Sequence, residues 1–173
     1  MIRTLVGRVL AGSGVRSAPV DVDRVAASLG AEVRREPADN ELSGFLLRDT
    51  KAGSVVIGVN SNHHPNRQRF TIAHECGHLL LHKGEKVHVD RQGSGFHVNL
   101  RDAKAAEGVS EVEKEANLFA AELLMPASFL ETDLAKSGGM DLFDEDVLNV
   151  LAGKYRVSAQ ALTYRLAYLG YVK

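Results

Sequence analysis

The chain has one cysteine, Cys76, among 173 residues, and almost no net charge. A single cysteine excludes an intrachain disulfide framework and fits a reducing compartment. With 21 Lys and Arg against 22 Asp and Glu, the formal net charge is −1. Such a chain has no general positive field to attract nucleic acid or an anionic membrane. We therefore expect neither of these as a direct partner.

Long apolar runs are also missing. No stretch of about 20 apolar residues occurs, so no segment predicts a membrane-spanning helix. The opening residues, MIRTLVGRVL, carry too much charge and too short an apolar run for a signal peptide, and we expect a cytoplasmic protein. The composition, 45% hydrophobic and 25% charged, predicts one ordinary globular domain over residues 1–173.

The segment His74-Glu75-Cys76-Gly77-His78 carries the clearest chemical signal, because it has the HExxH spacing of zinc hydrolases. On a helix, four residues make about one turn, roughly 6 Å of rise, so both imidazoles leave the same face. Each can then reach one metal ion at about 2.0–2.1 Å. The pattern predicts His74 and His78 as metal ligands, and Glu75 as the base that acts on a metal-bound water.

A helical wheel that starts at Phe70 and runs through the motif to His82 is apolar nearly all round, apart from one narrow stripe. The stripe holds Thr71, His74, Glu75, His78 and His82. A buried polar stripe is costly unless something satisfies it, and a metal ion with its water would do so. The alternative is a solvent-exposed stripe of histidines that are already hydrogen-bonded.

Other residues of this helix support its assignment. Pro65 suits the first helical turn, where its missing N–H costs nothing. Gly77 in mid-helix indicates that a neighbour packs closely there, since glycine otherwise costs about 1 kcal/mol relative to alanine. We interpret Cys76 as a small buried residue rather than a nucleophile.

A catalytic zinc usually needs a third protein ligand and one position for water. His82 lies about 12 Å along the helix axis from His74, too far to share one metal with both motif histidines. We interpret His82 as a residue behind the ligands or on the substrate side. His88 and His97 lie in a glycine-rich polar stretch with no supporting pattern. The remaining candidates are carboxylates of a helix predicted at residues 111–125.

On the wheel of that helix, Glu113 falls on the apolar arc, where a carboxylate needs a partner. Asn117 lies four residues on, on the same face, where it can orient a ligand. We predict Glu113 as the third ligand and Asn117 as its orienting neighbour. Glu115 is the runner-up for the ligand. The plainer alternative is that the glutamates here form a solvated helix face.

Beyond these motifs, the chain resembles the ImmA/IrrE family of metallo-endopeptidases. The resemblance rests on segments spread through most of the chain: Pro19–Val22, Leu42–Phe45, Ile57–Asn60, Asn66–Phe70, Ala73–His78, His82, Glu113–Asn117, Leu123–Pro126, Val157–Ser158, Arg165–Leu166 and Gly170. The family often has a hydrophobic residue where Cys76 stands, a departure that touches neither the ligands nor the base.

The resemblance implies an α+β fold, a small zincin-like domain of the minimal gluzincin type. A short mixed sheet would pack on the HExxH helix, followed by a helical C-terminal part. It implies zinc bound by His74, His78 and a glutamate, with Glu75 as base, although such a ligand set also accepts manganese. It further implies a protein substrate, a helix-turn-helix transcriptional repressor. Some relatives cleave such repressors and thereby release stress-response or mobile-element genes.

Four stretches are predicted along the chain: helices and strands in 1–60, the HExxH helix in 64–83, a polar loop with short strands in 84–110, and a helical part in 111–173. The predicted strands cover 31–35, 43–48, 54–59, 86–89 and 96–100. The segment 54–60, just before the motif helix, is expected to offer a strand edge to an extended peptide.

Two helices predicted at 144–155 and 158–169 have the outline of a helix-turn-helix. We interpret them as a pair that closes the catalytic domain, because their few cations form no basic stripe. These cations are Lys154, Arg156, Arg165 and Lys173.

The leading function is a metal-dependent endopeptidase, in which a second donor besides the metal stabilises the oxyanion. The unranked candidates for that donor are His82, Arg69, Tyr155, Tyr164 and Arg165. Two other classes stay open: a non-catalytic metal-binding sensor that acts by protein–protein binding, and a DNA-binding regulator acting through the C-terminal helix pair.

Overall fold

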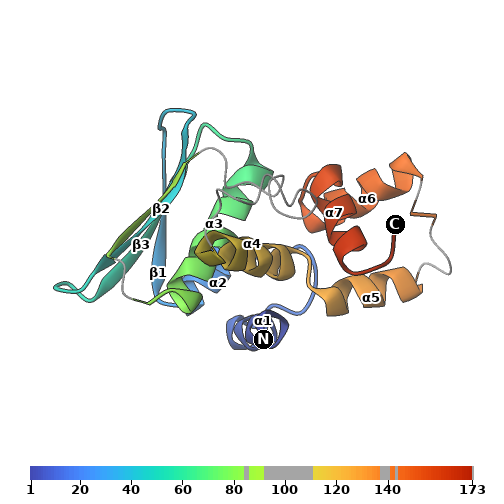
Figure 1. The fold of residues 1–173 in the computed structure, drawn as a ribbon, viewed down its shortest axis with the longest axis horizontal. Helices are drawn as coiled ribbons and strands as arrows, with labels where there is room; N and C mark the ends of the chain where they lie inside the picture. Colours follow the sequence, from blue (N-terminus) through green and yellow to red (C-terminus); the bar gives the residue numbers. More distant parts are fainter. Residues whose placement is uncertain (84–85, 92–110, 137–140, 143, 173) are drawn as a thin grey trace.

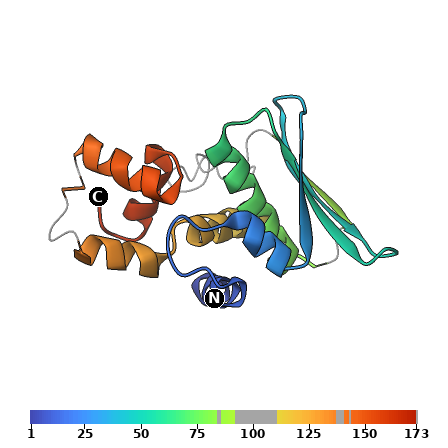
Figure 2. The same cartoon turned by 180° about the vertical axis from the view of Figure 1, so that it is seen from behind.

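A computed structural model describes residues 1–83, 86–91, 111–136, 141–142 and 144–172 (Figure 1). Its helices are α1 (Ile2–Ser13), α2 (Val22–Ser28), α3 (Pro65–Leu81), α4 (Glu111–Leu124), α5 (Ala127–Lys136), α6 (Glu145–Tyr155) and α7 (Ala159–Tyr168). Its strands are β1 (Ala31–Glu36), β2 (Leu42–Asp49), β3 (Ser54–Asn60) and β4 (Val87–Arg91). The sheet lies at one end of the molecule, α3 and α4 pack beside it, and α5, α6 and α7 gather at the other end (Figures 1 and 2).

The sheet has the strand order β1-β3-β2-β4. β1 pairs with β3 in parallel, whereas β2 pairs antiparallel with both β3 and β4. This mixed sheet, packed on the motif helix, confirms the predicted α+β class. The expectation that 54–60 offers an open edge is wrong, because β3 is paired on both sides: Val59 faces Arg35 on one side and Gly44 on the other.

The predicted elements are found with small shifts at their ends. The motif helix runs over Pro65–Leu81, with Pro65 in its first turn as expected. The short strand expected at 86–89 becomes β4, which continues to Arg91. The strand expected at 96–100 lies outside the described residues. No helix within the described ranges is long and apolar enough to cross a membrane.

Gly77 marks the place where α4 crosses α3. A Cβ added at Gly77 would lie 3.1 Å from the Cα of Ala116 and 3.3 Å from the Cβ of Phe119. The close neighbour predicted from a mid-helix glycine is therefore α4. Because Glu113 lies one turn before Ala116, this crossing brings its carboxylate to the level of the motif histidines.

Arg48 of β2 holds the C-terminal end of α3. Its Nη2 donates to the carbonyl oxygens of His78 at 2.8 Å and His82 at 3.0 Å. The His78 carbonyl also accepts from the His82 backbone N–H at 3.1 Å, and the guanidinium adds a second donor to it and one to the His82 carbonyl just past the helix end. The motif helix is thereby held against β2 at the turn that carries His78.

The C-terminal helices begin where the sequence predicts. Asp144 caps α6 by accepting from the backbone of Asp146 and Val147, and Ser158 caps α7 by accepting from Ala161. Buried residues of this pair, among them Tyr155 and Leu162, belong to the same hydrophobic cluster as the residues of β3 and α4. This continuity favours the interpretation that the pair packs on the rest of the fold.

A buried ion pair joins α7 to α4. Arg165, 2% exposed, pairs with the carboxylate of Glu122, and its Nε donates to the Met125 carbonyl at 3.1 Å. The other oxygen of Glu122 accepts from the Ala127 backbone N–H at 3.2 Å. The cluster thus ties the C-terminal pair to the C-terminal end of α4. Glu113 lies in the first turn of the same helix.

We expect Arg165→Ala to lower the free energy of unfolding by about 3–5 kcal/mol, because the buried Glu122 carboxylate would lose its buried counter-ion and keep only the exposed Arg3, 3.9 Å away. Urea unfolding with and without the change measures this. Thr163→Ala, at an exposed position of the same helix, is the control and should have little effect. The double change Arg165→Met with Glu122→Leu should recover most of the loss. A loss below about 1 kcal/mol for Arg165→Ala would contradict this account.

Candidate metal centre

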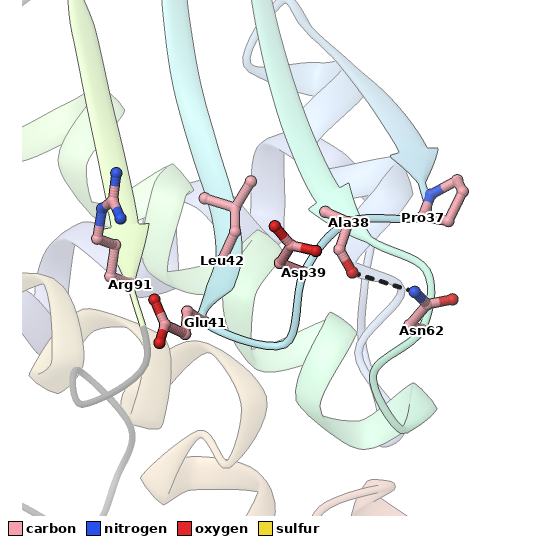
Figure 3. Close-up of a pocket in the computed structure, with 7 residues that line it drawn as sticks. All are labelled: Pro37, Ala38, Asp39, Glu41, Leu42, Asn62 and Arg91. Atoms are coloured by element: carbon pink, nitrogen blue, oxygen red, sulfur yellow. Dashed lines mark hydrogen bonds between the residues drawn. The ribbon is translucent and has the colours of Figure 1, made fainter.

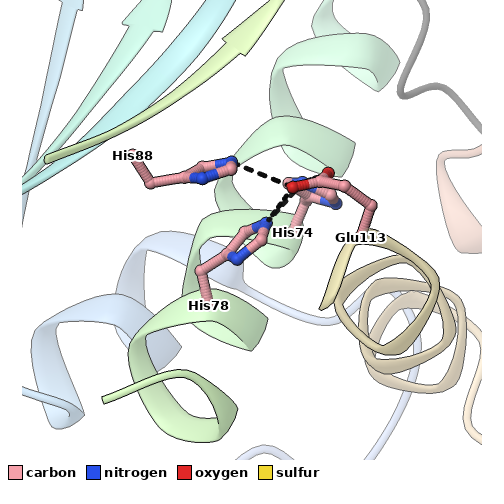
Figure 4. Close-up of side chains that lie close together, drawn as sticks. All are labelled: His74, His78, His88 and Glu113. Carbon is pink, nitrogen blue, oxygen red and sulfur yellow. Dashed lines mark hydrogen bonds and ion pairs between the residues drawn. The ribbon is translucent and has the colours of Figure 1, made fainter. Parts of the chain in front are cut away.

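His74 and His78 project from α3, one turn apart, toward Glu113 of α4 (Figure 4). The two Nε2 atoms lie 3.0 Å apart, and each lies 3.3 Å from one carboxylate oxygen of Glu113. Donors bound tetrahedrally at about 2.0–2.1 Å from one ion lie about 3.3–3.4 Å from one another. The three side chains therefore have the spacing of three vertices around a single ion, and the donor set fits zinc.

The protonation states of these groups also suit metal binding. Burial lowers the pKa of His78 to about 4, so its imidazole is neutral at neutral pH. Burial opposes ionisation of Glu113, but hydrogen bonds from His74 and His78 outweigh it and hold the pKa of the carboxyl well below its usual range. Metal ligands must be deprotonated, and the lowered pKa values of His78 and Glu113 both favour that state.

Glu75 follows His74 in α3 and does not belong to the group of possible ligand atoms. Its side chain is fully buried, and neither carboxylate oxygen has a hydrogen-bond partner among the described residues. Burial raises the pKa of Glu75 well above its usual value, and the charges of Asp90 and Glu113 raise it further. A buried carboxylate with a raised pKa is well suited to accept a proton from a nearby water.

His82 and Glu115 form a second layer behind His78. The Nδ1 atoms of His82 and His78 lie 3.2 Å apart, and His82 Nε2 lies 3.0 Å from Glu115 Oε2. Such a carboxylate–histidine contact fixes the orientation of a ligating ring. Glu115, the runner-up for third ligand, is thus placed against His82 while Glu113 faces the histidine pair.

Asn117 is buried, at 7% exposure, on the expected face of α4. Neither atom of its side-chain amide has a hydrogen-bond partner within the described ranges. The hydrogen bond that we predicted from Asn117 to Glu113 is therefore not formed. His97 lies outside the described residues.

His88 joins this group although no sequence pattern selected it. The ligand atoms of His74, His78, His88 and Glu113 all lie within 4.8 Å of one another. A signal was present in the alternation of β4: Val87 and Val89 are 53% and 46% exposed, whereas His88 and Asp90 face the helices. The alternation alone could not show that His88 faces the centre, because the sequence does not say which face of this strand is covered.

Asp90 is a further buried acid near the centre. Ser43, the extra residue at a β-bulge where β2 pairs with β4, hydrogen-bonds to Asp90 and accepts from Arg67 Nη2 at 3.0 Å. Bulges often turn a side chain into a site, and here both Ser43 and the following Gly44 are buried. Burial raises the pKa of Asp90 to about 6, despite the opposing effects of His74 and Arg67.

We expect Asp90→Asn to stabilise the metal-free protein at pH 7. The pKa of Asp90 rises from 3.8 to about 6 on folding, so the folded state binds more protons between these pH values and stability falls as pH rises through them. Above that window the penalty is complete, on the order of 2–3 kcal/mol. Urea unfolding at pH 7 should show this gain for the variant, and at pH 4 the gain should shrink below about 1 kcal/mol. An equal gain at both pH values would show that ionisation is not its cause.

A separate pocket lies at one end of the sheet, in front of the β1–β2 loop (Figure 3). It is lined by Pro37, Ala38, Asp39, Glu41, Leu42, Asn62 and Arg91. Asn60 holds this loop through hydrogen bonds from its amide to the carbonyls of Ala38, Asp39 and Leu42. The metal-facing side chains do not line this pocket, so it is distinct from the centre.

Comparison with known proteins gives matches over most of the chain. The family model described as IrrE N-terminal-like domain (peptidase M78) matches residues 26–167. The radiation response metalloprotease IrrE of Deinococcus deserti is 35% identical over 113 residues, which cover 65% of this chain and 36% of that protein. The metallopeptidase ImmA of Bacillus subtilis is 28% identical over 130 residues, covering 75% and 66%. This chain thus spans about a third of the length of the Deinococcus relative.

A solved structure, described as a Mycobacterium tuberculosis transcriptional regulator, is similar with a TM-score of 0.59. The match covers 96% of this chain and 46% of that one, at 17% sequence identity. A likeness at this level of identity concerns the fold alone.

Proposed function

Because this chain belongs to the IrrE N-terminal-like family of metallopeptidases, we propose that it is a zinc-dependent endopeptidase that cleaves a protein substrate. The observation that carries this proposal is the triangle of His74 Nε2, His78 Nε2 and the Glu113 carboxylate, with edges of 3.0–3.3 Å. Three protein ligands leave one tetrahedral position for water, as catalytic zinc sites require. The same donors also accept manganese.

The roles of the protein side chains follow from their positions. A zinc ion in this triangle would acidify a bound water and polarise the scissile carbonyl. Glu75 accepts the proton of the attacking water and later passes it to the leaving amine. Its burial keeps bulk water from competing for that proton. His82 and Glu115 hold the His78 ring, and Arg48 holds the turn of α3 that carries it.

For the substrate, we propose a helix-turn-helix repressor, supported by the family resemblance of the sequence. The C-terminal helix pair is less suited to binding DNA itself, because two of its cations are engaged within the protein. Lys154 lies 2.6 Å from Asp133, and Arg165 is buried against Glu122. The chain would then regulate stress-response or mobile-element genes indirectly, by cleaving the repressor that controls them.

The test uses the purified, zinc-loaded chain and a small helix-turn-helix protein encoded beside its gene. Intact-mass spectrometry should show one pair of complementary fragments. A chelator should stop the reaction, and added zinc, or manganese in a parallel sample, should restore it. Cleavage of an unrelated protein but not of the repressor would contradict the proposed substrate, while the proposed peptidase activity would stand. Stable binding without any hydrolysis would favour the non-catalytic sensor.

A further inference from the structure

Peptide hydrolysis at this centre needs a donor that stabilises the oxyanion, and the sequence candidates for it are engaged elsewhere. Tyr155 donates its hydroxyl to Asp133 at 2.8 Å, and Arg165 is paired with Glu122. His82 is held between His78 and Glu115.

The other two candidates face other parts of the fold. The charges that act on the pKa of Arg69 belong to Arg156, Asp21 and Asp23, which lie outside the centre. Tyr164 accepts a hydrogen bond from Gln160 at 3.3 Å on the exposed side of α7. Within the part of the chain that the structure describes, the donor must be sought among side chains that face the metal triangle.

His88 is such a side chain, and it approaches from the sheet, opposite the helices that carry the triangle (Figure 4). Its Nε2 lies 3.5 Å from Glu113 Oε1, and its side chain is 13% exposed. The side chains of His88 and Glu113, at 13% and 22% exposure, are the solvent-accessible members of this group, whereas His74 and His78 are 0% and 1% exposed. A substrate carbonyl would enter from the side where His88 and Glu113 are exposed.

The orientation of the His88 ring is not that of a fourth ligand. Two imidazoles bound through Nε2 at about 2.0–2.1 Å to one tetrahedral ion have ring centroids about 5 Å apart. The His74 and His78 rings approach this arrangement, with centroids 4.6 Å apart and planes at 71°. The His88 ring instead stacks on His78, with centroids 3.7 Å apart and planes at 27°. A centroid separation of 3.7 Å is too short for two imidazoles bound to one tetrahedral ion, so in this arrangement His88 lies beside the ion rather than on it.

We propose that His88 is a catalytic residue whose Nε2–H donates a hydrogen bond to the developing oxyanion. The proposal rests on the peptidase function proposed above. When water attacks, a C–O bond forms, the carbonyl π electrons move to oxygen, and Glu75 takes the water proton. When the C–N bond breaks, that proton goes to the leaving amine. His88 keeps its own proton throughout, so its contribution is electrostatic.

Loss of one oxyanion donor typically lowers kcat by about 10²–10³. We expect His88→Ala to show such a loss with little change in KM and with zinc affinity, measured by chelator competition, within about threefold of the unmodified chain. His88→Gln, which keeps a side-chain N–H, should recover part of kcat. Val89→Ala, on the exposed face of the same strand, is the matched control.

A binding measurement keeps the test independent of turnover. A peptidyl phosphonamidate, whose tetrahedral phosphoryl group mimics the oxyanion, is titrated into each zinc-loaded protein. Its Kd should rise about 100-fold in His88→Ala and much less in His88→Gln. An unchanged Kd would overturn the proposal, and so would a zinc affinity lowered more than 100-fold, which would make His88 a ligand. If the unmodified chain cleaves nothing, the proposed peptidase function fails, while the phosphonamidate result still decides the role of His88.

Discussion

Replacing Glu75 with glutamine should abolish peptide hydrolysis while leaving the metal in place. Glutamine has nearly the same shape as glutamate and can fill the same buried space, but it cannot take a proton from water. General-base catalysis contributes about 10²–10⁴ in rate, and we expect a loss at the upper end because Glu75 is fully buried next to the ligand His74 and is not itself spaced as a ligand. Fragment formation by mass spectrometry and zinc content by atomic emission measure the two effects separately.

Cys76→Ala provides the matched control for Glu75→Gln, because it changes the next residue of the same buried turn. Burial raises the pKa of the Cys76 thiol to about 12, so the thiol stays protonated and is not a nucleophile at neutral pH. This variant should keep most of the activity. Hydrolysis at the unmodified rate in Glu75→Gln would show that another group acts as the base.

Replacing Glu113 with alanine should remove the metal, whereas replacing Glu115 should only weaken its binding. Glu113 contacts both motif histidines at 3.3 Å, and we expect its loss to lower zinc affinity by at least about 10³-fold. Glu115 reaches the centre only through His82, and loss of such an outer contact typically costs about 10–100-fold. Chelator competition measures both affinities on the same scale.

Glu111→Ala controls for general effects of losing a carboxylate from α4. The Glu111 side chain is 84% exposed and pairs with Lys114, one turn along the helix surface. Its removal should leave zinc affinity unchanged. Loss of metal in Glu115→Ala but not in Glu113→Ala would reverse the assignment of the third ligand.

The sequence was most informative where the signal is local. Helical periodicity placed His74, Glu75 and His78 on one face, and the same reasoning on the second helix separated Glu113 from Glu115. The two C-terminal helices were predicted to start at Asp144 and Ser158, and the structure has these residues as the N-caps of α6 and α7. Each of these features depends on residues within a few positions of one another, which is the range over which sequence patterns act.

Features that depend on strand pairing could not be predicted in the same way. β3 was expected at an edge, but the parallel pairing with β1 and the antiparallel pairing with β2 place it in the interior. The contribution of His88 depends on which face of β4 is covered, and that of Asp90 on a bulge at Ser43 in a different strand. A one-residue change of register reverses the faces of a strand, so such side chains are assigned only once the partner strand is known.

The missing side chain at Gly77 has a consequence for ion selectivity. It sets the distance between the helix that supplies two donors and the helix that supplies the third, because the backbone of Ala116 rests directly on it. Bond lengths to different ions differ by only a few tenths of an ångström, about 2.0–2.2 Å for zinc and 2.3–2.6 Å for calcium. An ion bound by His74, His78 and Glu113 would span this crossing, so a methyl group added at Gly77 is expected to move the two helices apart and change the size of ion that fits.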